Sequence, residues 1–170
     1  IPGLADEVSP VSEAERAALA ALPPIEPDLR RAMGLGRNIG GPRLADGYLA
    51  PTLNVRAIHG GDTGPDAANA IATEAEASFD IRLAPGMTPA FVHRKVEDHL
   101  KAQGWTIVRD TPDLAARLAN PKIVRLNWDE GESVATKTAM DGPAASAVAA
   151  SIGRTVGYPV LKLPIVGASS

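Results

Sequence analysis

The most decisive secondary-structure signal in this sequence is Glu74-Ala75-Glu76-Ala77-Ser78-Phe79-Asp80-Ile81-Arg82-Leu83-Ala84-Pro85-Gly86. From residue 74 to residue 83, polar and apolar side chains alternate without a break. Because successive side chains of a β-strand point to opposite faces, this pattern predicts a strand with one face in the core and the other face polar. The Pro85-Gly86 pair that follows is typical of a turn and ends the predicted strand.

A second strand is predicted upstream, over residues 52–58, where the periodicity is again two. One face is expected to carry Leu53, Val55 and Ala57, and the other Asn54, Arg56 and Ile58. The loop after it, residues 59–66, reads His-Gly-Gly-Asp-Thr-Gly-Pro-Asp and is rich in turn-forming residues.

Two helices are predicted downstream of the decisive strand. The first begins with Thr88 as N-cap and Pro89 at the first helical position, and it ends before Gly104. Its apolar stripe consists of Val92, Val96 and Leu100. The second helix begins near Pro143 and ends at Gly157. Its stripe consists of Ala144, Val148, Ile152 and Val156. Short strands are predicted over residues 105–108, 122–128 and 160–163.

Residues 1–50 are interpreted as a linker with short helices. Ser12 and Glu15 have the spacing of a capping box, and the helix that they begin is stopped by Pro23-Pro24. A second short helix over residues 28–33 is ended by Gly34.

These elements predict an α+β fold, a ferredoxin-like two-layer sandwich with an antiparallel sheet and helices on one face. We place this unit at residues 51–118. Residues 119–170 carry their own strand, helix and strand, and we expect them to belong to a different sheet, as a partial segment of an α/β domain.

Composition excludes several classes of protein. The 170 residues are 45% hydrophobic with a net charge of −3, and the basic residues are scattered, so no nucleic-acid footprint is visible. The absence of cysteine excludes disulfides, a thiol nucleophile and cysteine-ligated zinc, and it fits a reducing cytoplasm. No apolar run approaches the roughly 20 residues of a membrane span. The chain begins with isoleucine rather than methionine, which suggests an interior fragment.

The titratable residues do not suggest an intact metal site. The three histidines are His59, in a loop, and His93 and His99, both on the first predicted helix. Six positions on a helix amount to a rotation of roughly 240°, so His93 and His99 cannot share a site, and both are interpreted as solvated surface residues. The sequence Gly167-Ala168-Ser169 begins like a nucleophile elbow, but no histidine and aspartate are placed to activate the serine. We therefore predict no catalytic residue and no metal ligand in this chain.

Arg82 has two interpretations. It lies two residues from Asp80 on the polar face of the decisive strand, so the pair can be a surface ion pair of under ~1 kcal/mol. Alternatively, a guanidinium held by a rigid strand can bind a substrate carboxylate bidentately. Asn69, in the loop before that strand, is by itself most often a turn residue.

Three motifs carry a resemblance to a known family. They are the Gly60-Gly61 strand end, the sequence Asn69-Ala70-Ile71-Ala72-Thr73-Glu74-Ala75, and Asp80-Ile81-Arg82-Leu83-Ala84-Pro85-Gly86. They resemble the lid (dimerisation) domain of clan MH di-zinc metallopeptidases and amidohydrolases: carnosinase-like dipeptidases, succinyl-diaminopimelate desuccinylase, acetylornithine deacetylase and aminoacylase. Ala72 replaces the usual proline. The tail Val166-Gly167-Ala168-Ser169 is similar to a Gly-Gly-Ser loop of that family, and residues 6–16 resemble a linker of its carnosinase-like branch.

The resemblance implies substrate-binding roles for four residues. In the carnosinase-like branch a lid arginine binds the substrate carboxylate, which corresponds to Arg82, and a polar residue thirteen positions earlier corresponds to Asn69. The tail loop implies contacts from Gly167 and Ser169, whereas His59 is taken as incidental. Lids of this family pair across a two-fold axis, which implies a homodimer whose lid groups can serve the neighbouring subunit's site.

The resemblance also implies an activity for a longer protein. Two zinc ions (or manganese or cobalt), held by residues outside this chain, would hydrolyse an amide bond in a dipeptide or N-acyl amino acid, and this chain would be inactive alone. The alternative is a free-standing ferredoxin-like module that dimerises or binds a small ligand without catalysis.

Overall fold

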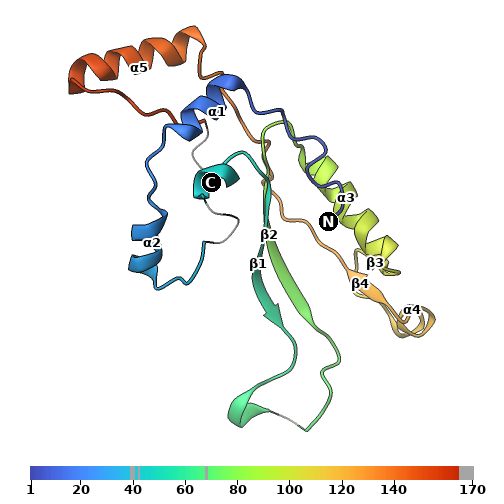
Figure 1. Ribbon diagram of the computed structural model, residues 1–170. Coiled ribbons are helices and arrows are strands. Elements are labelled where there is room, and N and C mark those ends of the chain that lie inside the picture. The colour runs from blue at the N-terminus through green and yellow to red at the C-terminus, as the bar shows by residue number, and fades with distance from the viewer. Residues whose placement is uncertain (39–40, 42, 68, 165–170) are drawn as a thin grey trace.

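The decisive stretch forms one strand of an antiparallel hairpin. In the computed structural model, β1 (Thr52–His59) pairs with β2 (Glu76–Arg82), and Thr52 lies opposite Arg82 at one end. Figure 1 shows the hairpin as a long extension from the body of the molecule. The pairing confirms both predicted strands. The structure describes residues 1–38, 41, 43–67 and 69–164.

A β-bulge changes which β1 side chains share a face. The register shifts between Val55 and Ala57, which leaves Arg56 as an extra residue. Because side chains alternate with period two, one extra residue reverses the facing of everything after it. Ile58 therefore shares the face of Phe79, and the prediction that Ala57 lies on the apolar face is wrong.

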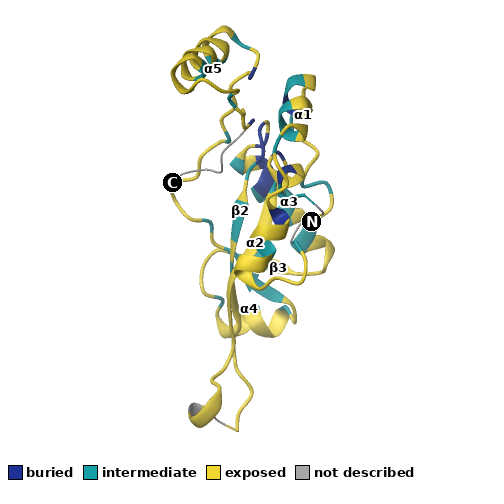
Figure 2. Cartoon of the chain, turned by 60° about the vertical axis from the view of Figure 1, so that its left-hand side comes forward, coloured by how far each residue is buried: buried dark blue, intermediate teal, exposed yellow. Residues whose placement is uncertain are grey.

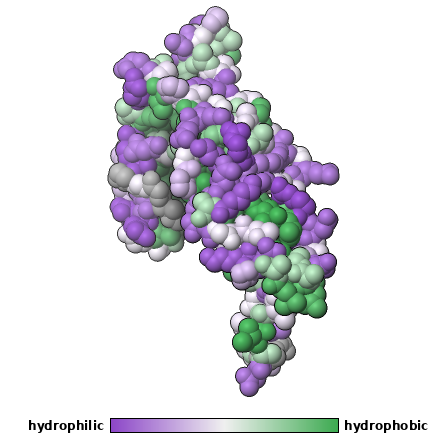
Figure 3. Space-filling model, turned by 90° about the vertical axis from the view of Figure 1, so that its right-hand side faces the viewer, coloured by the Kyte–Doolittle hydropathy of each residue, from purple (hydrophilic) through white to green (hydrophobic). Residues whose placement is uncertain are grey.

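The apolar face of the hairpin is largely open. Phe79 is 51% exposed and Ile58 is 77% exposed. Figure 2 shows most of the hairpin in the exposed colour, and Figure 3 shows a hydrophobic patch on this narrow extension. The prediction that this whole face lies in a core is wrong, because α3 packs only near the end of β2, around Ile81.

The core lies where β2 turns into α3 (Pro89–Ala102). Its buried members are Ala84, Met87, Phe91 and Val92. Around them pack the partly buried residues Leu4, Val8, Ile81, Leu83 and Val96. Thr88 caps α3 by accepting a hydrogen bond from the Phe91 backbone N–H, as predicted. Two of these packing residues come from the N-terminal segment, so the start of the chain closes the core beside α3 (Figure 1).

Gly86 permits the N-terminal segment to lie directly on this turn. The Ser9 N–H donates to the Pro85 carbonyl at 2.7 Å. Gly86 has φ +97°, and a Cβ built on it would lie 2.6 Å from Ser9 Oγ. Both the backbone conformation and the close approach require glycine here.

A second, parallel pair of strands follows α3. β3 (Thr106–Val108) pairs with β4 (Ile123–Arg125), and helix α4 (Leu114–Ala119) lies between them in sequence. As expected, β4 lies in a different sheet from the β1–β2 hairpin. Its partner in that second sheet is β3, which the prediction had placed in the unit at residues 51–118. Helix α4 was not predicted, although Asp113 is a recognisable N-cap. The predicted α+β class, with a small antiparallel sheet and helices, is confirmed.

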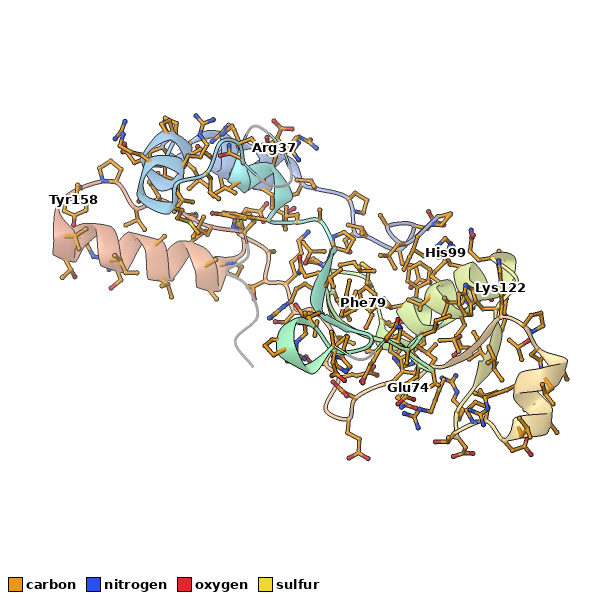
Figure 4. All side chains as sticks on the ribbon, turned by 90° about the horizontal axis from the view of Figure 1, so that it is seen from below. Arg37, Glu74, Phe79, His99, Lys122 and Tyr158 are labelled. Atoms are coloured by element: carbon orange, nitrogen blue, oxygen red, sulfur yellow. The ribbon has the colours of Figure 1, made fainter. Side chains whose placement is uncertain are left out.

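The remaining helices lie beside or away from this body. They are α1 (Glu13–Ala20), α2 (Glu26–Met33), the 3₁₀ turns η1 (Leu44–Gly47) and η2 (Gly64–Asp66), and α5 (Pro143–Val156). In Figure 4, Tyr158, just after α5, lies at the opposite end of the molecule from His99 on α3. The predicted stripe of α5 is exposed, as Val148 at 60% illustrates. No helix within the described residues has both the length and the apolarity to cross a bilayer.

The prediction of a strand over residues 160–163 is wrong. These described residues have no regular secondary structure. A strand needs a neighbour for its backbone hydrogen bonds, and nothing among the described residues pairs with this one.

Glu15 forms an ion pair that connects the N-terminal segment to the segment that follows β4. Its carboxylate forms the predicted capping box with Ser12 and lies 2.8 Å from Lys137 Nζ. Only 1% of Glu15 is exposed. Burial by itself would raise the pKa of Glu15, but hydrogen bonds from Lys137 and Ser12 outweigh it and hold the pKa below its usual 4.5.

We predict that Gly86→Ala destabilises the protein more than Gly34→Ala. Gly34 also has positive φ (+64°), but an added Cβ there meets nothing within 4 Å. Gly34→Ala should lower the free energy of unfolding by about 1 kcal/mol through backbone strain, and Gly86→Ala by roughly 3 kcal/mol because overpacking is added. Urea unfolding followed by circular dichroism measures both. Equal losses would contradict the close approach of Ser9.

We predict a pH-dependent cost for Lys137→Met. At pH 7 the substitution should lower the free energy of unfolding by roughly 2 kcal/mol, because it leaves a buried carboxylate without its cation. Since the folded pKa of Glu15 is depressed, the pair stabilises the protein fully above about pH 4.5 and is lost as pH falls through the folded pKa. The difference from wild type should therefore shrink between about pH 5 and pH 3.

Lys101→Met is the matched control, because Lys101 pairs at the surface with Glu97 at 3.5 Å. It should cost under ~1 kcal/mol at any of these pH values. A Lys137→Met cost that stays constant from pH 7 to pH 3 would refute the role given to Glu15.

Candidate functional site

Arg82 lies at the last position of β2, at the end of the hairpin that joins the body. Its Nε donates to Asp80 Oδ2 at 2.8 Å, and 54% of its side chain is exposed. The ion pair of the first interpretation is therefore present. It leaves more than half of the arginine side chain open to solvent, so the second interpretation stays compatible with the geometry.

The cross-strand neighbours of this pair are also polar. Thr52 lies opposite Arg82, and Asn54 lies opposite Asp80. The Asn54 side-chain amide donates to Thr52 Oγ1 at 3.1 Å. Paired residues share a face, so four hydrogen-bonding side chains gather at this end of the hairpin. The arrangement provides a planar guanidinium for a carboxylate, among neighbours that can donate or accept hydrogen bonds.

Asn69 lies at the other end of the hairpin. It is exposed in the loop between η2 and β2, beyond the pair His59–Glu76. The seven residues of β2 span about 23 Å at roughly 3.3 Å per residue. Within one chain, Asn69 and Arg82 therefore do not meet around a single small molecule. Gly167 and Ser169 lie outside the described residues.

His93 makes contacts that the sequence did not suggest. Its ring stacks on Trp128 with centroids 3.8 Å apart and an interplanar angle of 17°. Its Nε2 lies 2.5 Å from Glu132 Oε1. The interpretation of His93 as a solvated surface residue is wrong. Trp128 and Glu132 are 35 and 39 positions away, beyond any local spacing rule, so only the packing of the return segment on α3 reveals the cluster.

The described residues do not fit a zinc site. No group of three or more metal-ligating side chains gathers among them. His93 is engaged with Trp128 and Glu132, and His59 is at the loop end of the hairpin. No metal-dependent step is therefore assigned to the described residues.

Comparison with known proteins adds two findings. A family described as "Peptidase dimerisation domain" matches residues 12–105, which is more than half of the chain. The fold is similar to the crystal structure of an M20 family metallo-carboxypeptidase from Sulfolobus solfataricus, with a TM-score of 0.71 and 21% sequence identity. The match covers 96% of this chain and 34% of that protein, so the chain spans about a third of its length.

Proposed function

Because the chain belongs to the M20 peptidase dimerisation-domain family, we propose that it is the lid of a zinc-dependent amide hydrolase that binds the carboxylate of its substrate. The similarity to a protein about three times as long supports a role as part of a larger enzyme. The substrate class proposed is a dipeptide or N-acyl amino acid. The metal ions would be held by residues outside this chain and would supply an activated water.

The observation that carries this proposal is the placement of Arg82. A strand that is hydrogen-bonded to β1 holds its backbone, and Asp80 holds its Nε. A guanidinium fixed in this way can donate to both oxygens of a carboxylate and orient the adjacent amide bond. Arg82 lies three residues before the buried Pro85, so the turn further restricts the backbone at this end of β2.

The separation of Asn69 from Arg82 supports a shared site in a homodimer. The hairpin extends from the body, and its loop end exposes Ile71 almost fully, at 96%. We propose that Arg82 serves the site of its own subunit, whereas Asn69 reaches the substrate of the neighbouring subunit. Lid groups at opposite ends of one hairpin would then act in different sites.

We predict that Arg82→Ala in the complete enzyme lowers kcat/KM by roughly 10²-fold, about 3 kcal/mol, for a substrate with a free carboxylate. The loss should be much smaller for the corresponding carboxamide, which offers no charge to the guanidinium. Arg56→Ala is the control, since Arg56 is an exposed arginine of the same hairpin. Steady-state kinetics with zinc present tests this. Unchanged kcat/KM would exclude carboxylate binding by Arg82.

We predict that two impaired variants complement each other in a mixed dimer. If Arg82 and Asn69 serve different subunits, a dimer of Arg82→Ala with Asn69→Ala has one intact site and one doubly defective site. Co-expression in equal amounts should recover about a quarter of wild-type activity, because half of the dimers are mixed. No recovery would place both residues in one subunit's site, and sedimentation of the wild type as a monomer would exclude the shared site altogether.

A further inference from the structure

Asp80 is placed to control the orientation of the Arg82 side chain. Residues i and i+2 of a strand point to the same face, so the two side chains lie on one side of β2. Asp80 Oδ2 accepts a hydrogen bond from Arg82 Nε at 2.8 Å. The side chain of Asp80 is 35% exposed, which makes it the more buried member of the pair.

This contact constrains more than one atom of Arg82. The guanidinium is planar and rigid, so fixing Nε fixes the plane in which its remaining N–H groups donate. Arginine loses up to about 2 kcal/mol of side-chain entropy when it is immobilised, and a residue that orders it beforehand removes part of that cost from substrate binding. Aspartate suits this task because its side chain is short and its backbone is held opposite Asn54 in the paired strands.

We propose that Asp80 is a positioning residue that orders Arg82 for the substrate carboxylate. This inference rests on the carboxylate-binding role proposed above for Arg82. The surface ion pair and the carboxylate-binding arginine are then not alternatives, because the ion pair prepares the arginine. The contribution of the pair to stability stays small, as for other exposed ion pairs, and its effect lies in substrate affinity.

A double-mutant cycle in the complete enzyme tests the proposal. The four proteins are wild type, Asp80→Asn, Arg82→Ala and the double variant, assayed with a dipeptide or N-acyl amino acid that wild type hydrolyses. Asp80→Asn keeps the shape of the side chain but removes its charge. We expect it to lower kcat/KM about tenfold, mainly through KM, and to lower it no further when Arg82 is already alanine.

The control is Glu76→Gln, which removes a carboxylate from the same face of the same strand at the end away from Arg82. It should leave KM unchanged. Discrimination between the carboxylate substrate and its carboxamide is the second readout, because Asp80→Asn should reduce it, whereas a general loss of structure would lower both rates alike.

The outcomes separate the two proposals. If Arg82→Ala has the same kcat/KM as wild type, the carboxylate-binding role fails, and the role of Asp80 fails with it. If Arg82→Ala is impaired but Asp80→Asn has full activity or a lower KM, Asp80 does not position Arg82, although Arg82 retains its role. An equal loss from Asp80→Asn in both backgrounds likewise overturns the positioning role alone.

Discussion

The close contact between the N-terminal segment and the turn at Gly86 holds β2 and α3 around the buried core. The small buried core lies at this turn, and the Ser9–Pro85 hydrogen bond closes it from the side of the N-terminus. β2 enters the turn and α3 leaves it, so the turn sets the angle between the hairpin and the helix. Arg82 stands just before this point. The buried core therefore adjoins the residue that we assign to substrate binding.

Away from that core, side-chain contacts between distant segments hold the architecture together. The segment after β4 has no regular secondary structure. Its Trp128 stacks on His93 of α3, and its Lys137 pairs with Glu15 of α1. Such contacts fix position without burying much apolar surface. The buried Glu15 carboxylate depends on its cation, whereas the exposed ion pairs of the chain contribute little to stability. The two contacts give the described residues a defined path between the hairpin and the segments on either side of it.

In the proposed function, one hairpin contributes to two sites. Its base is anchored by the core, and Arg82 is ordered there by Asp80. Its loop end carries Asn69 far from the core, with apolar side chains open to solvent. A two-stranded hairpin with both faces exposed is only marginally stable in water. Association with another subunit would give it the partner surface that the described residues do not provide.

Local sequence patterns were enough to predict the strand over residues 76–82, the turn at Pro85-Gly86, and the helices that begin at Pro89 and Pro143. These features depend on local periodicity and on the backbone preferences of proline, glycine and capping residues, which act over a few positions. The sequence also singled out Arg82 with Asp80, because residues two apart on a strand share a face. Contacts made on folding, by contrast, set the bulge at Arg56, the pairing of β3 with β4 and the stacking of His93 on Trp128. Those features join segments that are far apart in the chain, and no local pattern encodes which distant partner a residue will meet.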